Sequence, residues 1–265
     1  MKIAVISDIH EDIVSLKKAL KMIEIEKCNQ IVCLGDILGY PFIRGKYADT
    51  KNAAECIDLI KKNCSIVLLG NHDVFHLKKI PKYCNGFQFP SKWYEMSIEE
   101  KKEISKGKVW NYSDDLSIIV SEKDNNYLSK LPEFLIKDYG EVQVLFSHFN
   151  YPNFTGYVSG HNSDDQRIKE HFNFMKKNSC KISICGHTHI EGLGICYESN
   201  SSIISQLLGG FMYYSYGERR IKDKYCCISI PALADNGQVN GFAIIDTTNL
   251  SINAISLNTN RRFIM

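Results

Sequence analysis

Acidic, amide and imidazole side chains stand directly after short apolar stretches at five separate points of this sequence. They are Asp8 and His10 after residues 2–7, Asp36 after 30–34, Asn71 and His72 after 65–69, His148 after 141–146, and His187 and His189 after 181–185. Carboxylate and imidazole ligands without thiolate suit borderline divalent ions such as Mn, Fe, Ni, Co or Zn. The candidate ligands are too many for one ion in a tetrahedral site, so the pattern predicts two ions that share a bridging carboxylate.

The elements that position these residues are read from the apolar stretches themselves. Each stretch is short and rich in β-branched residues, which is typical of a buried parallel strand. Amphipathic helical patterns at 14–27 and 51–62 separate the first three strands, and this order predicts parallel pairing with right-handed crossovers. Ligands gather at the carboxyl ends of such strands. A lone histidine there is more often a structural, hydrogen-bonded residue, but five polar strand ends together would be costly without cations.

The rest of the chain predicts further strands and helices, and the sequence contains no internal repeat. A helix is expected at 126–131, ended by Pro132, and another at 164–177. Turn residues separate the apolar stretches of the C-terminal part. The strands predicted there are 192–198, 202–208, 225–230, 241–247 and 251–257. We expect one domain over residues 1–265, in which 74–139 form a helical or irregular insertion that shapes the substrate cleft.

Composition limits the function classes. The 265 residues are 44% apolar and 23% charged with a net charge of +2, so no nucleic acid, membrane or acidic partner is indicated. The ten cysteines form no CxxC pairs, and Cys33, Cys185, Cys226 and Cys227 lie in apolar stretches, which favours buried, reduced thiols. No signal peptide precedes the first strand and no membrane span is evident, so a cytoplasmic location is expected.

Five motifs in this order resemble the motif blocks of the calcineurin-like metallophosphoesterase superfamily. The motifs are Asp8-x-His10, Gly35-Asp36-x-x-Gly39, Gly70-Asn71-His72-Asp73, Ser147-His148 and Gly186-His187-Thr188-His189. The stretch 35–41 is most similar to the small bacterial phosphodiesterase branch. The resemblance implies an α/β fold, namely a four-layer αββα sandwich of two mixed β-sheets flanked by helices.

The resemblance also implies roles for single residues. One metal would be held by Asp8, His10, Asp36 and His189, and the other by Asp36, Asn71, His148 and His187. Asp36 would bridge two divalent transition-metal ions, with Mn as the first expectation and Fe, Ni, Co or Zn as alternatives. His72 would be the catalytic histidine, outside the metal ligands.

One departure from the superfamily pattern concerns the orientation of that histidine. Phosphoprotein phosphatases of the superfamily carry an aspartate three residues after the bridging one, and the aspartate orients the catalytic histidine. Gly39 stands there in this chain. Asp73 and a main-chain carbonyl are the hypotheses for what orients His72 here.

The function implied is hydrolysis of a phosphoester, preferentially a diester, by a metal-bridging hydroxide with His72 as general acid. The alternatives are a catalytically weak scaffold, a phosphomonoesterase or phosphoprotein phosphatase, a nucleotide pyrophosphatase and a nuclease. The expected partner is a small-molecule or nucleotide phosphoester, while nucleic acid is not implied by the charge and the oligomeric state stays open. Aromatic residues at 110–112 favour a satellite core, those at 149–157 line either the cleft or the sheet, and His161 and His171 are expected at the surface or as caps.

Overall fold

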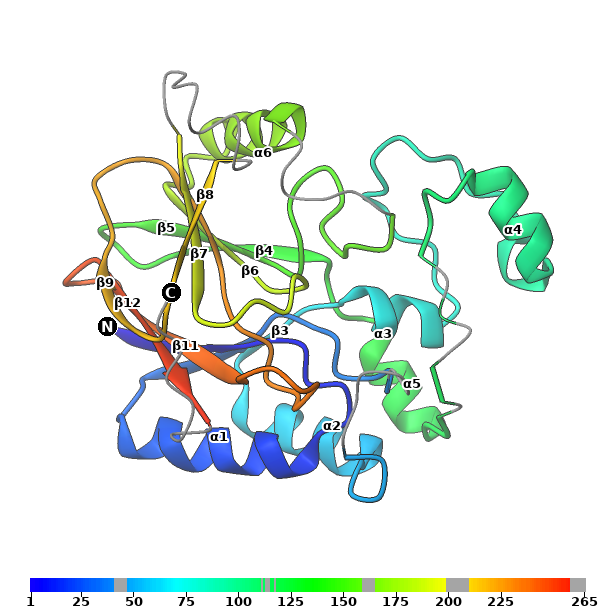
Figure 1. Ribbon diagram of the computed structural model, residues 1–265, viewed down its shortest axis with the longest axis horizontal. Helices are drawn as coiled ribbons and strands as arrows, with labels where there is room; N and C mark the ends of the chain where they lie inside the picture. The colour runs from blue at the N-terminus through cyan, green and yellow to red at the C-terminus, as the bar shows by residue number, and fades with distance from the viewer. Residues whose placement is uncertain are drawn as a thin grey trace.

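Two six-stranded β-sheets lie face to face, and helices cover their outer faces, in a computed structural model of the chain (Figure 1). The structure describes residues 1–40, 47–110, 112, 115, 116, 118–158, 165–198 and 210–257. The layers run helix, sheet, sheet, helix, so the predicted four-layer αββα sandwich of two mixed sheets is confirmed.

The first sheet has β1 near its centre and the order β3-β2-β1-β11-β12-β9. The first three strands pair in parallel as predicted, with Ile3 opposite Gln30 and Val32 opposite Ile66, and the other three pair antiparallel. The strands are β1 (Lys2–Ile6), β2 (Gln30–Cys33), β3 (Ile66–Val67), β9 (Gly217–Arg220), β11 (Gly241–Asp246) and β12 (Ser251–Ser256).

The second sheet has the order β4-β5-β6-β10-β7-β8. Its central strands β5, β6 and β10 are parallel, so the loops after β5 and β6 leave the sheet at the same edge. The outer strands pair antiparallel. The strands are β4 (Phe134–Asp138), β5 (Gln143–Ser147), β6 (Ile182–Cys185), β7 (Leu193–Tyr197), β8 (Phe211–Tyr214) and β10 (Cys226–Ser229).

Helices α1 and α2 cover the first sheet and α6 covers the second, whereas α4 lies far from both sheets (Figure 1). In α1 the buried residues Ile13, Leu16, Ala19 and Ile23 recur at helical spacing, and the carboxylate of Asp12 caps the first turn. The helices are α1 (Ile13–Ile25), α2 (Ala53–Asn63), α3 (Asn71–His76), η1 (Trp93–Glu95), α4 (Ile98–Ser105), α5 (Glu122–Leu128) and α6 (Asp165–Lys177).

The hydrophobic core follows the layers. Apolar side chains of both sheets, such as Val5 and Phe146, meet in a central cluster. A second cluster joins the first sheet to α1 and α2, and a third joins the second sheet to Phe172 of α6. Burying these side chains contributes about 1.5–3 kcal/mol each. The core therefore fixes the position of one sheet against the other, with the carboxyl ends of their parallel strands at one edge.

Several strand predictions differ from the structure. The sequence pattern did not predict β4, β8 and β9, because β4 and β9 are half-buried edge strands with charged residues and β8 exposes half of its side chains. Helix α5 begins at Glu122, earlier than expected, because the hydroxyl of Ser121 accepts a hydrogen bond from the Asp124 amide. The strand expected at 202–208 lies outside the described residues.

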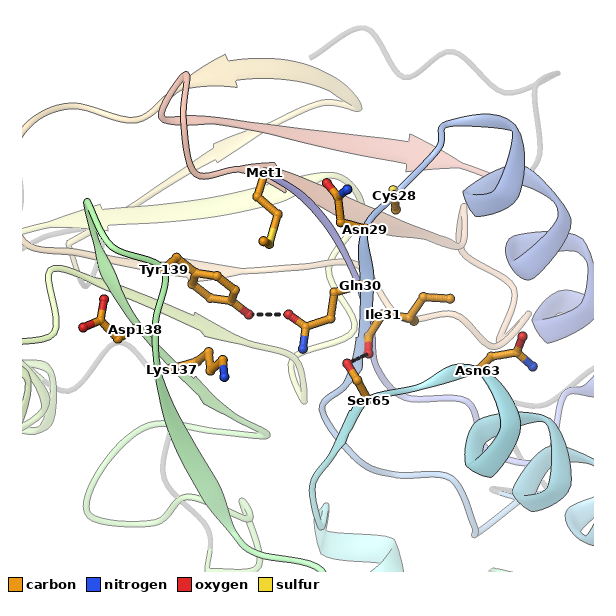
Figure 2. A pocket seen from close by; sticks show the side chains of 10 residues that line it. All are labelled: Met1, Cys28, Asn29, Gln30, Ile31, Asn63, Ser65, Lys137, Asp138 and Tyr139. Atoms are coloured by element: carbon orange, nitrogen blue, oxygen red, sulfur yellow. Dashed lines mark hydrogen bonds between the residues drawn. The ribbon is translucent and has the colours of Figure 1, made fainter.

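An open groove of about 720 Å³ lies where the parallel strands of the first sheet begin (Figure 2). In it the hydroxyl of Tyr139 donates a hydrogen bond to the side-chain oxygen of Gln30. None of the predicted site residues lines it.

Elsewhere in the chain, Cys33, Cys185, Cys226 and Cys227 are buried thiols as expected. Within the described residues, no helix is long and apolar enough to cross a membrane.

Candidate metal centre

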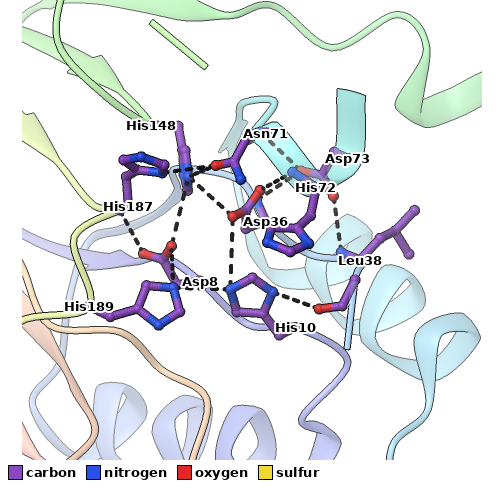
Figure 3. A network of polar contacts seen from close by, with 12 residues as sticks. Asp8, His10, Asp36, Leu38, Asn71, His72, Asp73, His148, His187 and His189 are labelled. Carbon is purple, nitrogen blue, oxygen red and sulfur yellow. Dashed lines mark hydrogen bonds and ion pairs between the residues drawn. The ribbon is translucent and has the colours of Figure 1, made fainter. Parts of the chain in front are cut away.

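The five polar strand ends meet at one edge of the two sheets (Figure 3). The loops after β1, β2 and β3 bring residues from the first sheet, and those after β5 and β6 bring residues from the second. All eight predicted site residues take part in one network of polar contacts. They are Asp8, His10, Asp36, Asn71, His72, His148, His187 and His189.

Asp8, His10 and His189 form one half of this network. The Oδ1 atom of Asp8 is 3.2 Å from Nε2 of His189, and Nε2 of His10 is 3.1 Å from that same nitrogen. The candidate ligand atoms of the three residues all lie within 4.8 Å of one another. The Nδ1–H group of His10 donates to the Gly39 carbonyl at 2.7 Å, so its Nε2 carries the lone pair that faces the cluster.

Asn71, His148 and His187 form the other half. The side-chain oxygen of Asn71 is 2.9 Å from Nε2 of His148 and 2.9 Å from Nδ1 of His187. Asp36 touches both halves, because its Oδ2 atom is 3.2 Å from Nε2 of His148 and 3.8 Å from Nε2 of His10. Asp36 therefore lies between the two groups of candidate ligands.

The backbone is strained at five of these eight residues. Asp8, His10, Asp36, His187 and His189 have φ values of 56°, 46°, 52°, 68° and 48°. The left-handed region costs a non-glycine residue roughly 1–3 kcal/mol, and such strain collects at functional sites. The tight turns after the strands aim the side chains at one point, which regular strand or helix geometry would not do.

Electrostatics favour neutral imidazoles at His10 and His187 and ionised carboxylates at Asp8 and Asp36. Burial lowers the pKa of His10 to about 4, helped by His72, and that of His187 to about 3, helped by His148. Burial raises the pKa of Asp8 and Asp36, but the neighbouring histidines outweigh it and lower both values. These four residues are thus in the protonation state in which they donate lone pairs to a cation.

Two features of the cluster fit divalent cations. Asp8 and Asp36 are 0% and 1% exposed, and buried carboxylates require compensating positive charge. Burial lowers the pKa of His148, yet these two carboxylates outweigh it and raise the pKa to about 9. In addition, Oδ1 of Asp8 accepts no hydrogen bond of good geometry from the described residues. The donor set therefore has both the charge and the unused lone pairs that a metal would take.

Asp73 supports the loop that carries Asp36. Its two carboxylate oxygens accept hydrogen bonds from the main-chain N–H groups of Asp36, Ile37, Leu38 and Gly70, at 2.8 to 3.0 Å. Burial, together with the charge of Asp36, raises the pKa of Asp73 to about 6. Because main-chain amides engage both oxygens of Asp73, the hypothesis that Asp73 orients His72 is wrong.

His72 instead contacts a carboxylate that the sequence analysis missed. Its Nδ1 atom is 2.6 Å from Oδ2 of Asp115, and Nε2 of His76 is 3.2 Å from the same oxygen. Burial raises the pKa of Asp115, but the hydrogen bonds from both histidines outweigh it and lower the pKa to about 2. For His72, burial lowers the pKa. The carboxylates of Asp36 and Asp115 outweigh this effect, so that the pKa of His72 is raised overall. No motif marks Asp115, because it lies in the stretch with the weakest sequence pattern.

A second residue missed by the sequence analysis is Asn236, whose side-chain amide lies 2.6 Å from Nδ1 of His189. An amide there orients the imidazole, as is usual behind metal-binding histidines. Asn236 belongs to a turn that carries no motif of its own, beyond the turn-forming sequence Asp235-Asn236-Gly237.

The expectations for aromatic residues and other histidines have mixed outcomes. Tyr112 and Tyr157 are buried and stack, which confirms the satellite core, whereas Trp110 is 43% exposed. Phe149 lies with its ring 4.6 Å from that of His187. The surface expectation for His171 is wrong: it is fully buried, its Nδ1 accepts from the Tyr151 amide and its Nε2–H donates to Ser183. His161 lies outside the described residues.

Comparison with known proteins agrees with this geometry. A family model described as calcineurin-like phosphoesterase matches residues 1–191. An uncharacterized protein of Methanocaldococcus jannaschii is 29% identical over 190 residues, which are 71% of this chain but only 62% of that protein. The match thus spans less than two thirds of the relative's length.

Solved structures extend the likeness in fold to nearly the whole chain. A metallophosphoesterase from Sphaerobacter thermophilus has a TM-score of 0.63 at 19% identity, over 97% of this chain and 88% of that one. A hypothetical protein from Pyrococcus horikoshii has a TM-score of 0.55 at 15% identity, over 96% and 87%. Since the family model covers well over half of the sequence, the chain belongs to the calcineurin-like phosphoesterase family.

Proposed function

We propose that this protein is a dinuclear metal-dependent phosphodiesterase in which His72 acts as general acid. The observation that carries the proposal is the division of the cluster into two groups of donors that share Asp36. Asp8, His10, Asp36 and His189 would hold one cation, and Asp36, Asn71, His148 and His187 the other. Manganese is the first ion to test, with Fe, Ni, Co and Zn after it.

Two divalent cations held there would supply Lewis acidity, polarising phosphate oxygens and making water a nucleophile near neutral pH. The seven proposed ligands contribute only two carboxylates, so four positive charges would leave the centre with a net attraction for a phosphate anion. His72 is not among the seven. Its Nδ1 is engaged by Asp115, which leaves Nε2 to protonate the leaving oxygen, a role worth typically about 10²–10⁴ in rate.

Preference for a diester is supported by the surface beside the cluster. The ring of Phe149 is 4.6 Å from that of His187, and the half-exposed ring of Trp110 is 6.4 Å from it. These rings offer an apolar wall where a second organic substituent on phosphorus would lie. The likeness of residues 35–41 to the small bacterial phosphodiesterase branch points the same way. We further propose that residues 1–265 form one domain in which 74–139 shape this cleft.

The test compares the metal-reconstituted protein on bis(p-nitrophenyl) phosphate and on p-nitrophenyl phosphate, together with metal analysis. We expect two ions per chain and a higher kcat/KM for the diester. The His72→Ala variant should keep both ions and lose most of its turnover of esters with poor leaving groups. Bound metal without turnover of any ester would favour the scaffold alternative, and a higher kcat/KM for the monoester would refute the diester preference.

A further inference from the structure

Gly39 explains why the orienting carboxylate of His72 comes from elsewhere in the chain. An ideal Cβ atom on Gly39 would lie 2.4 Å from Nδ1, 2.6 Å from Cβ and 2.7 Å from Cγ of His72. Real Cβ atoms essentially never approach that closely, and the φ of +85° at Gly39 disfavours any side chain there. No aspartate at this position can coexist with the observed place of the His72 ring.

Asp115, which comes later in the chain, contacts Nδ1 of His72. Its side chain is only 2% exposed and its Oδ2 atom lies 2.6 Å from Nδ1 of His72. A carboxylate can only accept, so the contact fixes the proton on Nδ1. Because one imidazole nitrogen is committed in this way, Nε2 is the nitrogen left for a substrate.

Main-chain hydrogen bonds hold Asp115 itself in place. The amide of Asp115 donates to the carbonyl of Tyr112, and the amide of Leu116 donates to the carbonyl of Tyr40. The ring of Tyr112 also packs edge-on against that of His72, with centroids 4.8 Å apart. The carboxylate is therefore anchored to the loop that follows Asp36, and its position does not depend on a single contact.

His76 is the second donor to this carboxylate. It lies one helical turn after His72 on α3, and its Nε2 atom is 3.2 Å from Oδ2 of Asp115. Residues four apart on a helix face the same side, so α3 presents both imidazoles to one oxygen. The Asp115 carboxylate is therefore held by two imidazoles rather than by one.

We propose that Asp115 is the positioning residue of His72, replacing the aspartate that Gly39 excludes, and that it keeps Nε2 of His72 directed at the leaving group. This inference rests on the proposed role of His72 as general acid. It assigns to Asp115 a part in turnover but none in metal binding.

The experiment compares Asp115→Asn and Asp115→Ala with Asp58→Asn, an exposed aspartate on α2 that serves as the matched control. Each metal-reconstituted protein is assayed on a diester with a good leaving group, p-nitrophenolate, and on one with a poor leaving group, a simple alkoxide. For Asp115→Ala we expect kcat on the alkyl ester to fall about 10²-fold, and for Asp115→Asn, which keeps an acceptor, we expect a smaller fall. Neither variant should change KM, metal content or kcat on the nitrophenyl ester by much. A merely structural role would lower both rates alike.

A second readout does not need activity. In the zinc-loaded full chain, ¹⁵N NMR should find the His72 proton on Nδ1 in the wild type and in Asp115→Asn, whose amide oxygen still accepts. In Asp115→Ala the proton should move to Nε2, the preferred site in a free histidine side chain. Asp115→Asn preserves the side-chain volume, so a folding failure of the alanine variant leaves the kinetic comparison intact.

The outcomes separate this inference from the proposed function. Loss of alkyl-ester turnover in His72→Ala but not in the Asp115 variants would overturn the role of Asp115 and leave the proposed function standing. An unchanged tautomer in Asp115→Ala would also overturn it, even in a protein that hydrolyses neither ester. A third zinc ion that disappears in Asp115→Asn would assign His72, His76 and Asp115 to a metal site instead, because their ligand atoms lie within 4.8 Å of one another.

Discussion

Replacing Gly39 with alanine should uncouple turnover from metal binding. The new Cβ atom would lie 2.4 Å from Nδ1 of His72, whereas ordinary contact begins at 3.4 Å, so the ring has to retreat by about 1 Å. The loop itself cannot give way easily. The Gly39 amide donates to Oε1 of Glu11 at 3.1 Å, and its carbonyl accepts from His10 at 2.7 Å. The displacement therefore falls on His72.

The magnitude follows from the geometry. Misplacing a catalytic group by 1 Å can cost about 10² in rate, so kcat on a diester with a poor leaving group should fall by about two orders of magnitude. A φ of +85° adds roughly 1–2 kcal/mol of strain for alanine, which should lower the free energy of unfolding by a similar amount. Metal content should stay at two ions per chain, because His72 is not a proposed ligand.

Gly140→Ala is the matched control for strain without a clash. Gly140 has a φ of +87°, and a Cβ atom there would meet nothing within 4 Å. The control should lose similar stability in a urea titration and keep its kcat. Wild-type kcat in a folded Gly39→Ala protein would refute the reasoning, and so would an equal loss of kcat in Gly140→Ala. Loss of metal from Gly39→Ala would instead trace the effect to His10.

Two further predictions concern the cluster and the core. Asp36→Asn should lower the affinity of both metals together in a chelator competition, because Oδ2 of Asp36 lies near donors of both halves; full two-metal occupancy would count against the bridge. Burial lowers the pKa of His171 from 6.5 to about 3, so between these pH values the unfolded chain binds a proton that the folded chain does not. Wild-type stability should therefore fall with decreasing pH in that window, by up to about 1.4 kcal/mol per pH unit. His171→Gln should flatten this part of the acid limb while lowering stability at pH 7, and parallel pH profiles of the two proteins would contradict the assignment.

The cluster could be predicted from the sequence because its residues follow strong local patterns. Asp8, Asp36 and His187 each come directly after a short β-branched run, and parallel strands deliver their carboxyl ends to one edge. The pattern needs no knowledge of distant contacts. For the same reason the parallel order of β1, β2 and β3 was predictable, whereas the polar edge strand β9 was not, since its sequence Gly-Glu-Arg-Arg carries no alternation.

The surroundings of the cluster could not be predicted, because they depend on contacts between residues far apart in the chain. Asp115 lies 43 residues after His72, in a stretch without periodicity, and only the folded loop brings the two together. His171 shows the same limit in the core: a histidine on an amphipathic helix is expected outside, yet Ser183 and the Tyr151 amide satisfy both of its nitrogens. Sequence patterns thus predicted the direction of the strands but not the hydrogen-bond partners of single polar groups.

Different parts of the fold therefore position the proposed metal ligands and the proposed general acid. The ligands stand on strained turns at the ends of central strands, which the packed core between the sheets holds rigid. The orientation of His72 depends on Asp115, which is held by two main-chain hydrogen bonds and by its contacts with His72 and His76. Regions with few buried apolar contacts open at lower free energy than core strands. Mild denaturant should therefore abolish general-acid catalysis before metal is released, and esters with good leaving groups should be the last to lose turnover.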